Sequence, residues 1–283
     1  MGSSLQTLFF TLSYLSADLH QQCLLLAPSS IHVSFYQALV CGSKVSNSPE
    51  VFHLQKMGII HMLVVSGAHL LFLSKILKLL FKSKLSIALE VLILFIFVCI
   101  CQFQIPVFRA WIFVVLKVID RRLKLFTPVL ALLLTSVVFC LSIFPDQKFS
   151  YTLLLSWLAC LGISLGRNAF TQALWIFIFI YPIINSFNPI PLWTILINAF
   201  LTPMIGLVLF PLSALSFIIP KLSMLVDHLW DGLFFMASTF TKQTQAPSAS
   251  LAPPSTSLLW VYALCLHFVI LSFSIRKKKN ETL

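Results

Sequence analysis

Long apolar runs that carry almost no charge constrain the fold of this chain more than any other feature. A helix that crosses a bilayer needs about 20 mostly apolar residues. Only 10% of the 283 residues are charged and 59% are hydrophobic, which leaves too few polar side chains to cover a soluble domain. We therefore predict an all-α, polytopic transmembrane helical bundle with about 8-10 membrane segments, some of them broken or interfacial. From Leu85 onward the expected crossings are 85–103, 105–119, 125–144, 149–166, 169–186, 191–219, 222–239 and 257–275.

The region ahead of these crossings is less regular. Residues 5–17 are apolar but too short for a full span, and the segment 23–41 is interrupted by Pro28. Cys23 and Cys41 flank loops, so they are either joined by a disulfide or two free thiols. We divide the chain into N-terminal weak spans with a polar loop (1–57), a transmembrane core (58–239), and a final part (240–283). That final part comprises an extracytoplasmic loop, the last transmembrane helix and a basic tail.

The net charge of +11 has three explanations: a polyanionic partner, anionic lipid headgroups, or cytoplasmic loops rich in Lys and Arg. The last is the default, because basic residues flank alternate ends of the expected crossings. The pattern predicts a multi-pass protein of the inner (plasma) membrane whose C-terminus is cytoplasmic. The basic groups are Lys82 with Lys84, Arg121 with Arg122 and Lys124, Arg167, Lys221, and Arg276 to Lys279.

Prolines are concentrated in one part of the chain. Six lie between residues 169 and 220, and each removes a backbone donor from a helix. Broken backbone at membrane depth is tolerated where protein or a water-filled cavity supplies hydrogen-bond partners. The cluster is therefore typical of a transport path, and also of ordinary kinked helices.

Soluble-enzyme signatures are missing from the sequence. It contains no HExxH, GxxxxGK[ST] or GxSxG motif and no pair of CxxC motifs. We therefore expect no enzymatic activity, no cofactor and no metal site. Asp227 and Asp231 lie one helical turn apart and flank His228, so they form either a proton or cation site or the solvated start of a helix.

The run GIIHMLVVSGAHLL, residues 58–71, places polar side chains inside an apolar helix. On a helix His61, Ser66 and His69 share one side. A nucleophile with its base would need an orienting carboxylate, and a metal site would need closer histidine spacing. The alternative is structural: Ser66 and Gly67 form a helix-packing face and the histidines hydrogen-bond across helices.

Two sets of cations could contact an anion. Lys75, Lys78 and Lys82 follow one another on one helical face, where they meet either a phosphate backbone or anionic lipid. Arg109 stands inside an apolar run, where it either lines a polar path or extends to the interface.

Four segments together resemble the competence domain of the ComEC family. Residues 38–71 resemble its ALLLGxxxxL…FRxxGLxHLLAISGLHV pattern through Ala38, Leu39, Gly42, Gly58, His61, Ser66, Gly67 and His69. Its PxxxRAxxM element is matched by Pro106, Arg109 and Ala110. Its PxxxxSxGFxLSFxAxxG element is matched by Pro145, Leu155, Ser156, Ala159 and Gly162, and its NxxxxP…LPL segment by Asn198, Ala199, Pro203, Pro211 and Leu212.

The chain also departs from that family. The arginine of FRxxG is missing, because Lys56 and Met57 stand before Gly58, and GLHV has become GAHL. Full-length family members carry an OB-like extracytoplasmic domain and often a metallo-β-lactamase-like nuclease domain. Neither is visible here, so we expect a short form of the family.

The resemblance implies a channel that passes single-stranded DNA across the inner membrane during competence and natural transformation. It implies a DNA receptor, a nuclease and a cytoplasmic helicase as partners, besides membrane lipids. The alternative function is a small-molecule or ion transporter with a polar site between broken helices. The residues expected along the DNA path are His61, Ser66, His69, Arg109, Ser156 and Asn198, with Lys75, Lys78 and Lys82 as phosphate or lipid contacts.

Overall fold

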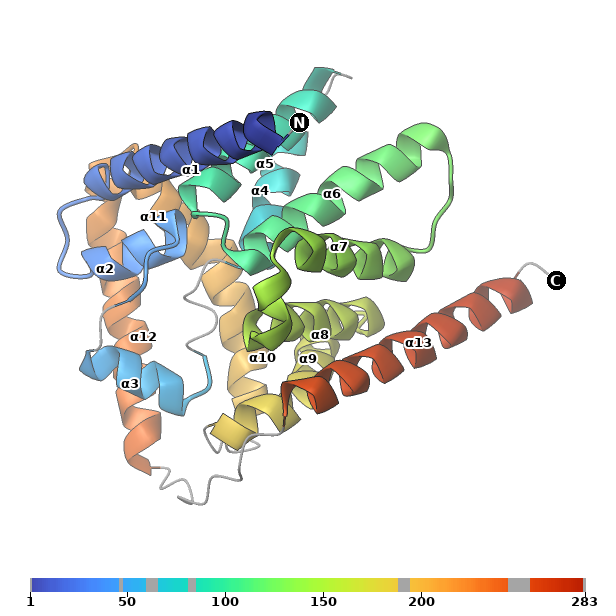
Figure 1. Cartoon of the computed structure of the whole chain (residues 1–283). Coiled ribbons are helices and arrows are strands. Elements are labelled where there is room, and N and C mark those ends of the chain that lie inside the picture. The colour runs from blue at the N-terminus through green and yellow to red at the C-terminus, as the bar shows by residue number, and fades with distance from the viewer. Residues whose placement is uncertain are drawn as a thin grey trace. The chain divides into compact units, whose positions relative to one another are not determined.

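A computed structural model describes residues 2–45, 48–59, 66–80, 85–187, 194–243 and 255–281, which are helical with no strand among them (Figure 1). The helices are α1 (Gly2–Leu25), α2 (Val33–Tyr36), α3 (Pro49–Lys56), α4 (Gly67–Leu80), α5 (Leu85–Ile100), α6 (Ile105–Leu123), α7 (Val129–Ile143), α8 (Tyr151–Leu165), α9 (Ala169–Phe187), α10 (Thr194–Met204), α11 (Phe210–Ser216), α12 (Ser223–Gln243) and α13 (Thr256–Glu281). The all-α prediction is confirmed for these residues.

Short non-α turns link several of these helices. A π-helical turn, Gln37–Cys41, continues α2, and another, Ile205–Leu209, joins α10 to α11. Turns of 3₁₀ helix, Pro145–Phe149 and Pro220–Leu222, precede α8 and α12. The expected crossing 191–219 therefore has a π-helical turn near its middle, and the helix continues through it.

The described helices form two compact units. The first comprises residues 1–111 and 190–247, and the second comprises residues 112–189 and 248–283. The two units therefore alternate along the chain, and the boundary at residues 111 and 112 falls within α6.

In the first unit α1 packs on α5. Ser16 donates a hydrogen bond to the carbonyl oxygen of Cys99 over 2.8 Å. Nδ1 of His20 lies 2.8 Å from the carbonyl oxygen of Ile100. A disulfide joins Cys23, near the end of α1, to Cys41 in the first π-helical turn. The N-terminal region is therefore a helix of 24 residues, longer than the apolar stretch 5–17 indicated.

In the second unit α8 and α9 approach very closely. A Cβ atom on Gly162 of α8 would lie 2.6 Å from the backbone nitrogen of Ile176 on α9, so only glycine fits there. Helix α13 packs on α8, where the indole N–H of Trp157 donates to Nδ1 of His267 over 3.3 Å. Both side chains are fully buried.

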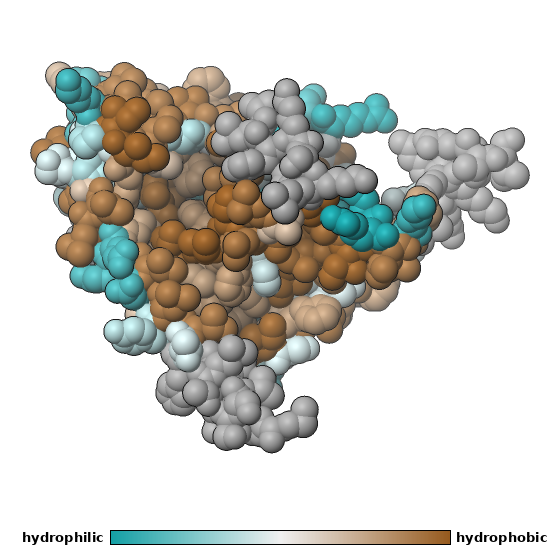
Figure 2. Space-filling view, turned by 90° about the horizontal axis from the view of Figure 1, so that it is seen from above, coloured by the Kyte–Doolittle hydropathy of each residue, from teal (hydrophilic) through white to brown (hydrophobic). Residues whose placement is uncertain are grey.

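Large apolar side chains cover much of the surface that Figure 2 shows, and hydrophilic side chains gather there in small groups. Two helical segments, Ile195–Ser216 and Thr256–Ser274, are long and apolar enough to cross a membrane, and only 25% and 22% of their residues are buried. Shorter apolar helices are Ile87–Ile100, Val129–Ile143, Tyr151–Leu165 and Phe170–Asn185. Exposed apolar area on this scale is unusual for a soluble monomer and typical of a surface that meets lipid or a partner.

Removing the disulfide tests the N-terminal assembly. The Cys23→Ser/Cys41→Ser variant is expected to lose about 3 kcal/mol of stability, because the crosslink closes a loop of 18 residues and restricts the unfolded chain. Thermal denaturation of the purified protein in detergent measures the change. Cys265→Ser, at an exposed free thiol, is the matched control. Equal stability of the two variants would contradict a structural disulfide.

Candidate functional site

The start of α4 is organised by two of the predicted site residues. The backbone N–H of Ser66 donates to Nδ1 of His69 over 2.9 Å, and the Ser66 hydroxyl oxygen lies 3.1 Å from the same nitrogen. His69, the third residue of α4, thereby accepts a hydrogen bond from the backbone N–H of Ser66, which precedes the helix. A Glu or Gln at this position does the same in a capping box. A neutral imidazole that accepts at Nδ1 carries its proton on Nε2. His69 is buried and packs against the ring of Phe210, with 4.5 Å between centroids.

Arg109 on α6 lies directly against this helix start. A Cβ atom on Gly67 would stand 3.0 Å from Cβ of Ala110, 3.2 Å from the carbonyl oxygen of Pro106 and 3.4 Å from Nη2 of Arg109. Gly67 is therefore the residue that lets α4 and α6 approach. Arg109 is only 2% exposed, so its guanidinium is held inside the first unit. Segments 40 residues apart in sequence thus form one site.

The electrostatic character of this site is positive. The N-terminus of a helix carries about half a positive charge, and its first N–H groups have no partners within the helix. A guanidinium adds a full charge and a planar set of donors that matches phosphate oxygens. The arrangement is suited to binding an anion such as a phosphodiester.

The other predicted path residues lie elsewhere. Asn198 is on α10, and its buried Oδ1 has no hydrogen-bond partner among the described residues. Ser156 is on α8 in the second unit and is half-buried. His61 and Lys82 lie outside the described residues. The structure therefore brings together Ser66, His69 and Arg109.

The lysines of α4 have different surroundings. Lys75 is exposed, whereas the Lys78 ammonium lies 3.0 Å from a carboxylate oxygen of Glu90 on α5. Glu90 is 4% exposed and also accepts a hydrogen bond from Ser74 over 2.5 Å. Glu90 is not among the predicted site residues, although a lone carboxylate in an apolar run indicates a functional or paired group.

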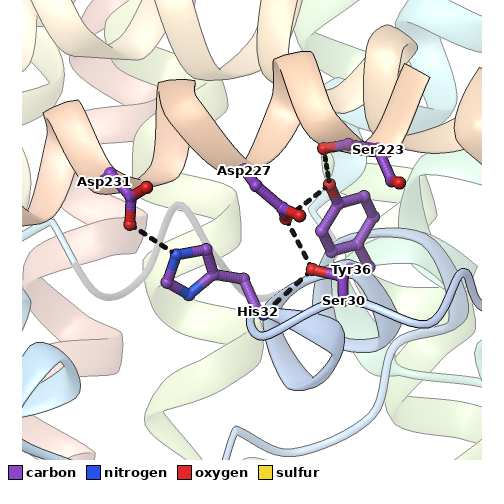
Figure 3. A network of polar contacts seen from close by, with 6 residues as sticks. All are labelled: Ser30, His32, Tyr36, Ser223, Asp227 and Asp231. Carbon is purple, nitrogen blue, oxygen red and sulfur yellow. Dashed lines mark hydrogen bonds and ion pairs between the residues drawn. The ribbon is translucent and has the colours of Figure 1, made fainter. Parts of the chain in front are cut away.

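A second polar cluster joins the N-terminal segment to α12 (Figure 3). Asp227 accepts a hydrogen bond from Ser30 over 2.5 Å, and its carboxylate oxygen lies 2.9 Å from the Tyr36 hydroxyl. That hydroxyl is also 2.9 Å from the carbonyl oxygen of Ser223. One turn further along α12, Asp231 lies 2.8 Å from Nε2 of His32. Both carboxylates are thus in contact with residues about 190 positions away.

Aromatic packing reinforces this cluster. Phe35 lies 5.2 Å from Trp230 and 4.8 Å from Phe234, measured between ring centroids. Within the part of the chain that the structure describes, no group of three or more His, Cys, Asp or Glu side chains is placed to hold a metal ion. The hydrogen bonds and ring contacts of this cluster form a clasp between residues 30–36 and α12.

Asp227 and Asp231 should differ in their contribution to stability. Asp227→Ala removes the acceptor of two part-buried hydroxyl groups and is expected to cost about 2 kcal/mol. Asp231 is 54% exposed, so Asp231→Ala should cost less than about 1 kcal/mol. Thermal denaturation in detergent compares the two variants. An Asp231 variant at least as unstable as the Asp227 variant would contradict this assignment.

Comparison with known proteins gives one match. A family model described as Competence protein matches residues 39–278. That range contains the start of α4, Arg109 and α12, whereas Ser30, His32 and Tyr36 precede it. No curated protein and no solved structure matches the chain.

Proposed function

Because the chain belongs to the competence protein family, we propose that it carries single-stranded DNA across the inner membrane during DNA uptake. Membership of this family supports a role in DNA uptake during competence. The observation that carries the proposal is the position of Arg109, buried against the first turn of α4.

A strand of DNA needs a polar, cation-lined passage, because hydrocarbon rejects the charge on each phosphate. Arg109 and the N-terminus of α4 would together offer donors and positive charge to one phosphate at a time. His69 keeps the start of α4 in place, and Gly67 allows Arg109 to reach it. In this proposal Ser66 and His69 position the site and Arg109 contacts the strand. Asn198 and Ser156 stay predictions for other parts of the path.

Basic residues and the disulfide support one orientation in the membrane. Disulfides persist in oxidising compartments, so we place Cys23 and Cys41 outside the cytoplasm. We propose that α5 to α9 and α13 each cross the membrane once. The cytoplasmic side then receives most of the basic residues, namely Lys84, Arg122, Arg167 and the basic tail. The protein would be a multi-pass inner-membrane protein with a cytoplasmic C-terminus.

This orientation changes the expected path of residues 191–219. The Tyr36 hydroxyl reaches Ser223 at the start of α12, and the Gln104 amide donates to the carbonyl oxygen of Gly42. Six helical residues from Tyr36 to Gly42 cover about 9 Å, much less than the hydrocarbon thickness of about 30 Å. The α5–α6 turn and the start of α12 therefore belong on the same side. The π-helical turn Ile205–Leu209 joins α10 and α11 into one continuous helical segment, and we propose that this segment starts and ends on that side without spanning the membrane.

Partners would supply the energy in this proposal. By resemblance to the family these are a DNA receptor, a nuclease that delivers one strand and a cytoplasmic helicase that pulls it, and the chain itself hydrolyses nothing. The transporter alternative relied on Asp227 and Asp231, and both carboxylates are in contact with side chains of the N-terminal segment. No observation favours it over the channel.

The test is uptake of fluorescently labelled DNA into the cytoplasm of the native host. A deletion strain is expected to accumulate labelled DNA outside the inner membrane, and the wild-type copy should restore entry. The label must be followed separately at the cell surface and in the cytoplasm, so that a defect in capture is distinguished from a defect in crossing. Undiminished cytoplasmic entry in the deletion strain would sink the channel proposal.

A further inference from the structure

The end of α6 and its turn into α7, residues 117–129, display a group of cations on the second unit. Lys117, Arg121, Arg122 and Lys124 are all exposed within eight residues. Asp120 is the acidic residue of this segment, and its carboxylate accepts a hydrogen bond from the backbone N–H of Thr127 over 2.9 Å. The carboxylate is thus used to shape the turn, and the surface around it is strongly basic.

Apolar side chains are exposed among these cations. Leu123 is 63% exposed, Leu125 60%, Phe126 80% and Val129 54%. Such side chains at a loop tip would be costly in water, since each exposes apolar area that burial would remove. A surface that mixes cations with protruding apolar groups is typical of segments that lie in the membrane interface.

The backbone holds this display in a defined conformation. The N–H of Leu125 donates to the carbonyl oxygen of Asp120 over 3.1 Å, which closes the end of α6. Lys124 and Phe126 both have φ of 53°, a left-handed conformation that glycine adopts most easily. A long cation and an aromatic ring therefore occupy positions where the backbone alone would favour glycine.

We propose that this turn docks on the anionic phospholipid surface of the membrane, with Leu125 and Phe126 inserted and the four cations on headgroup phosphates. The inference rests on the membrane placement given above, which puts the turn at the cytoplasmic leaflet. Anionic lipid is favoured as the occupant because it alone offers phosphates and hydrocarbon within one side-chain length. A nucleic acid would leave the apolar side chains in water.

The experiment places a fluorescent reporter at the tip of the turn. The full chain carrying Phe126→Trp is reconstituted in nanodiscs of phosphatidylcholine and phosphatidylglycerol, with brominated chains on one lipid or the other in equal amounts. Wild-type protein, which has six tryptophans, supplies the background to subtract. Brominated lipid should quench the added emission, and phosphatidylglycerol should quench about twofold more strongly than phosphatidylcholine.

Two further variants make the result specific. Replacing Lys117, Arg121, Arg122 and Lys124 with Gln should abolish the preference for phosphatidylglycerol and leave quenching itself in place. Lys148→Gln, at an exposed cation of the same unit, should change neither. If Phe126→Trp fails to fold, Leu125→Trp is the second reporter.

Three outcomes would overturn the proposal. Emission that neither lipid quenches would mean that the tip stays in water, and equal quenching by both lipids would mean that the cations do not select anionic headgroups. Loss of quenching on addition of single-stranded oligonucleotide would assign the surface to nucleic acid. None of these results depends on DNA transport, so they are separate from a failure of the channel proposal.

Discussion

Arg109→Ala is expected to lower entry of DNA into the cytoplasm on the order of 100-fold while the protein level stays unchanged. A hydrogen-bonded contact to a charged group contributes about 1.5–3 kcal/mol, and each 1.4 kcal/mol corresponds to a factor of ten. The side chain is only 2% exposed, so little water is available to replace it. Cytoplasmic label per cell, normalised to protein detected in the membrane fraction, measures the loss.

The controls distinguish charge from packing. Arg109→Lys keeps the charge but loses the planar donor set, so it should recover only part of the uptake. Lys148→Ala removes an exposed cation between α7 and α8 and should leave uptake within about twofold of wild type. If Lys148→Ala reduced uptake as much as Arg109→Ala, the site at the start of α4 would have no special role. Normal uptake by Arg109→Ala would exclude Arg109 from the path.

Gly162→Ala is expected to destabilise the protein by about 2 kcal/mol. Its added Cβ would lie 2.6 Å from the Ile176 nitrogen and 2.8 Å from the Ile176 Cα. Both are backbone atoms, so α8 and α9 must separate, at the cost typical of an overpacked core. The separation outweighs the gain of about 1 kcal/mol that alanine brings to a helix interior. Thermal denaturation in detergent measures the difference.

Gly232→Ala is the matched control for this prediction. Gly232 lies on α12, is exposed, and has nothing within 4 Å of an added Cβ. That variant should be as stable as wild type or slightly more stable, because only the helix propensity changes. Two glycine variants with the same stability would contradict the close approach of α8 and α9.

The sequence was sufficient to identify the family and the helical class. The resemblance to the ComEC competence domain, drawn from four short motifs, is confirmed by the match over residues 39–278. The motifs also have physical meaning in the structure. Gly67 and Arg109 belong to different motifs and lie close together, and Gly162 marks a close contact between α8 and α9. The site residues that could be predicted from the sequence are therefore those that belong to a family motif.

Contacts between distant, unpatterned segments could not be predicted in the same way. Ser30 and Tyr36 stand in a short polar interruption with no motif, and nothing in their spacing points to Asp227. In the sequence Glu90 is an isolated charge within an apolar run. In the structure the packing of α4 on α5 places Ser74 and Lys78 beside it. Hydrophobic periodicity predicts that a helix exists, but which helix lies beside it is decided by packing over the whole chain.

The clasp between the N-terminal segment and α12 has a consequence for biosynthesis. Ser30 and Asp227 are 197 residues apart, and α7, α8 and α9 of the second unit are made between them. At about 5–20 residues per second, a ribosome needs about 10 to 40 s to add that length. During that interval the first unit lacks α12, and the second unit receives α7, α8 and α9 in direct succession but still lacks α13. Because α13, which packs on α8, is synthesised last, nascent chains should complete the first unit sooner than the second.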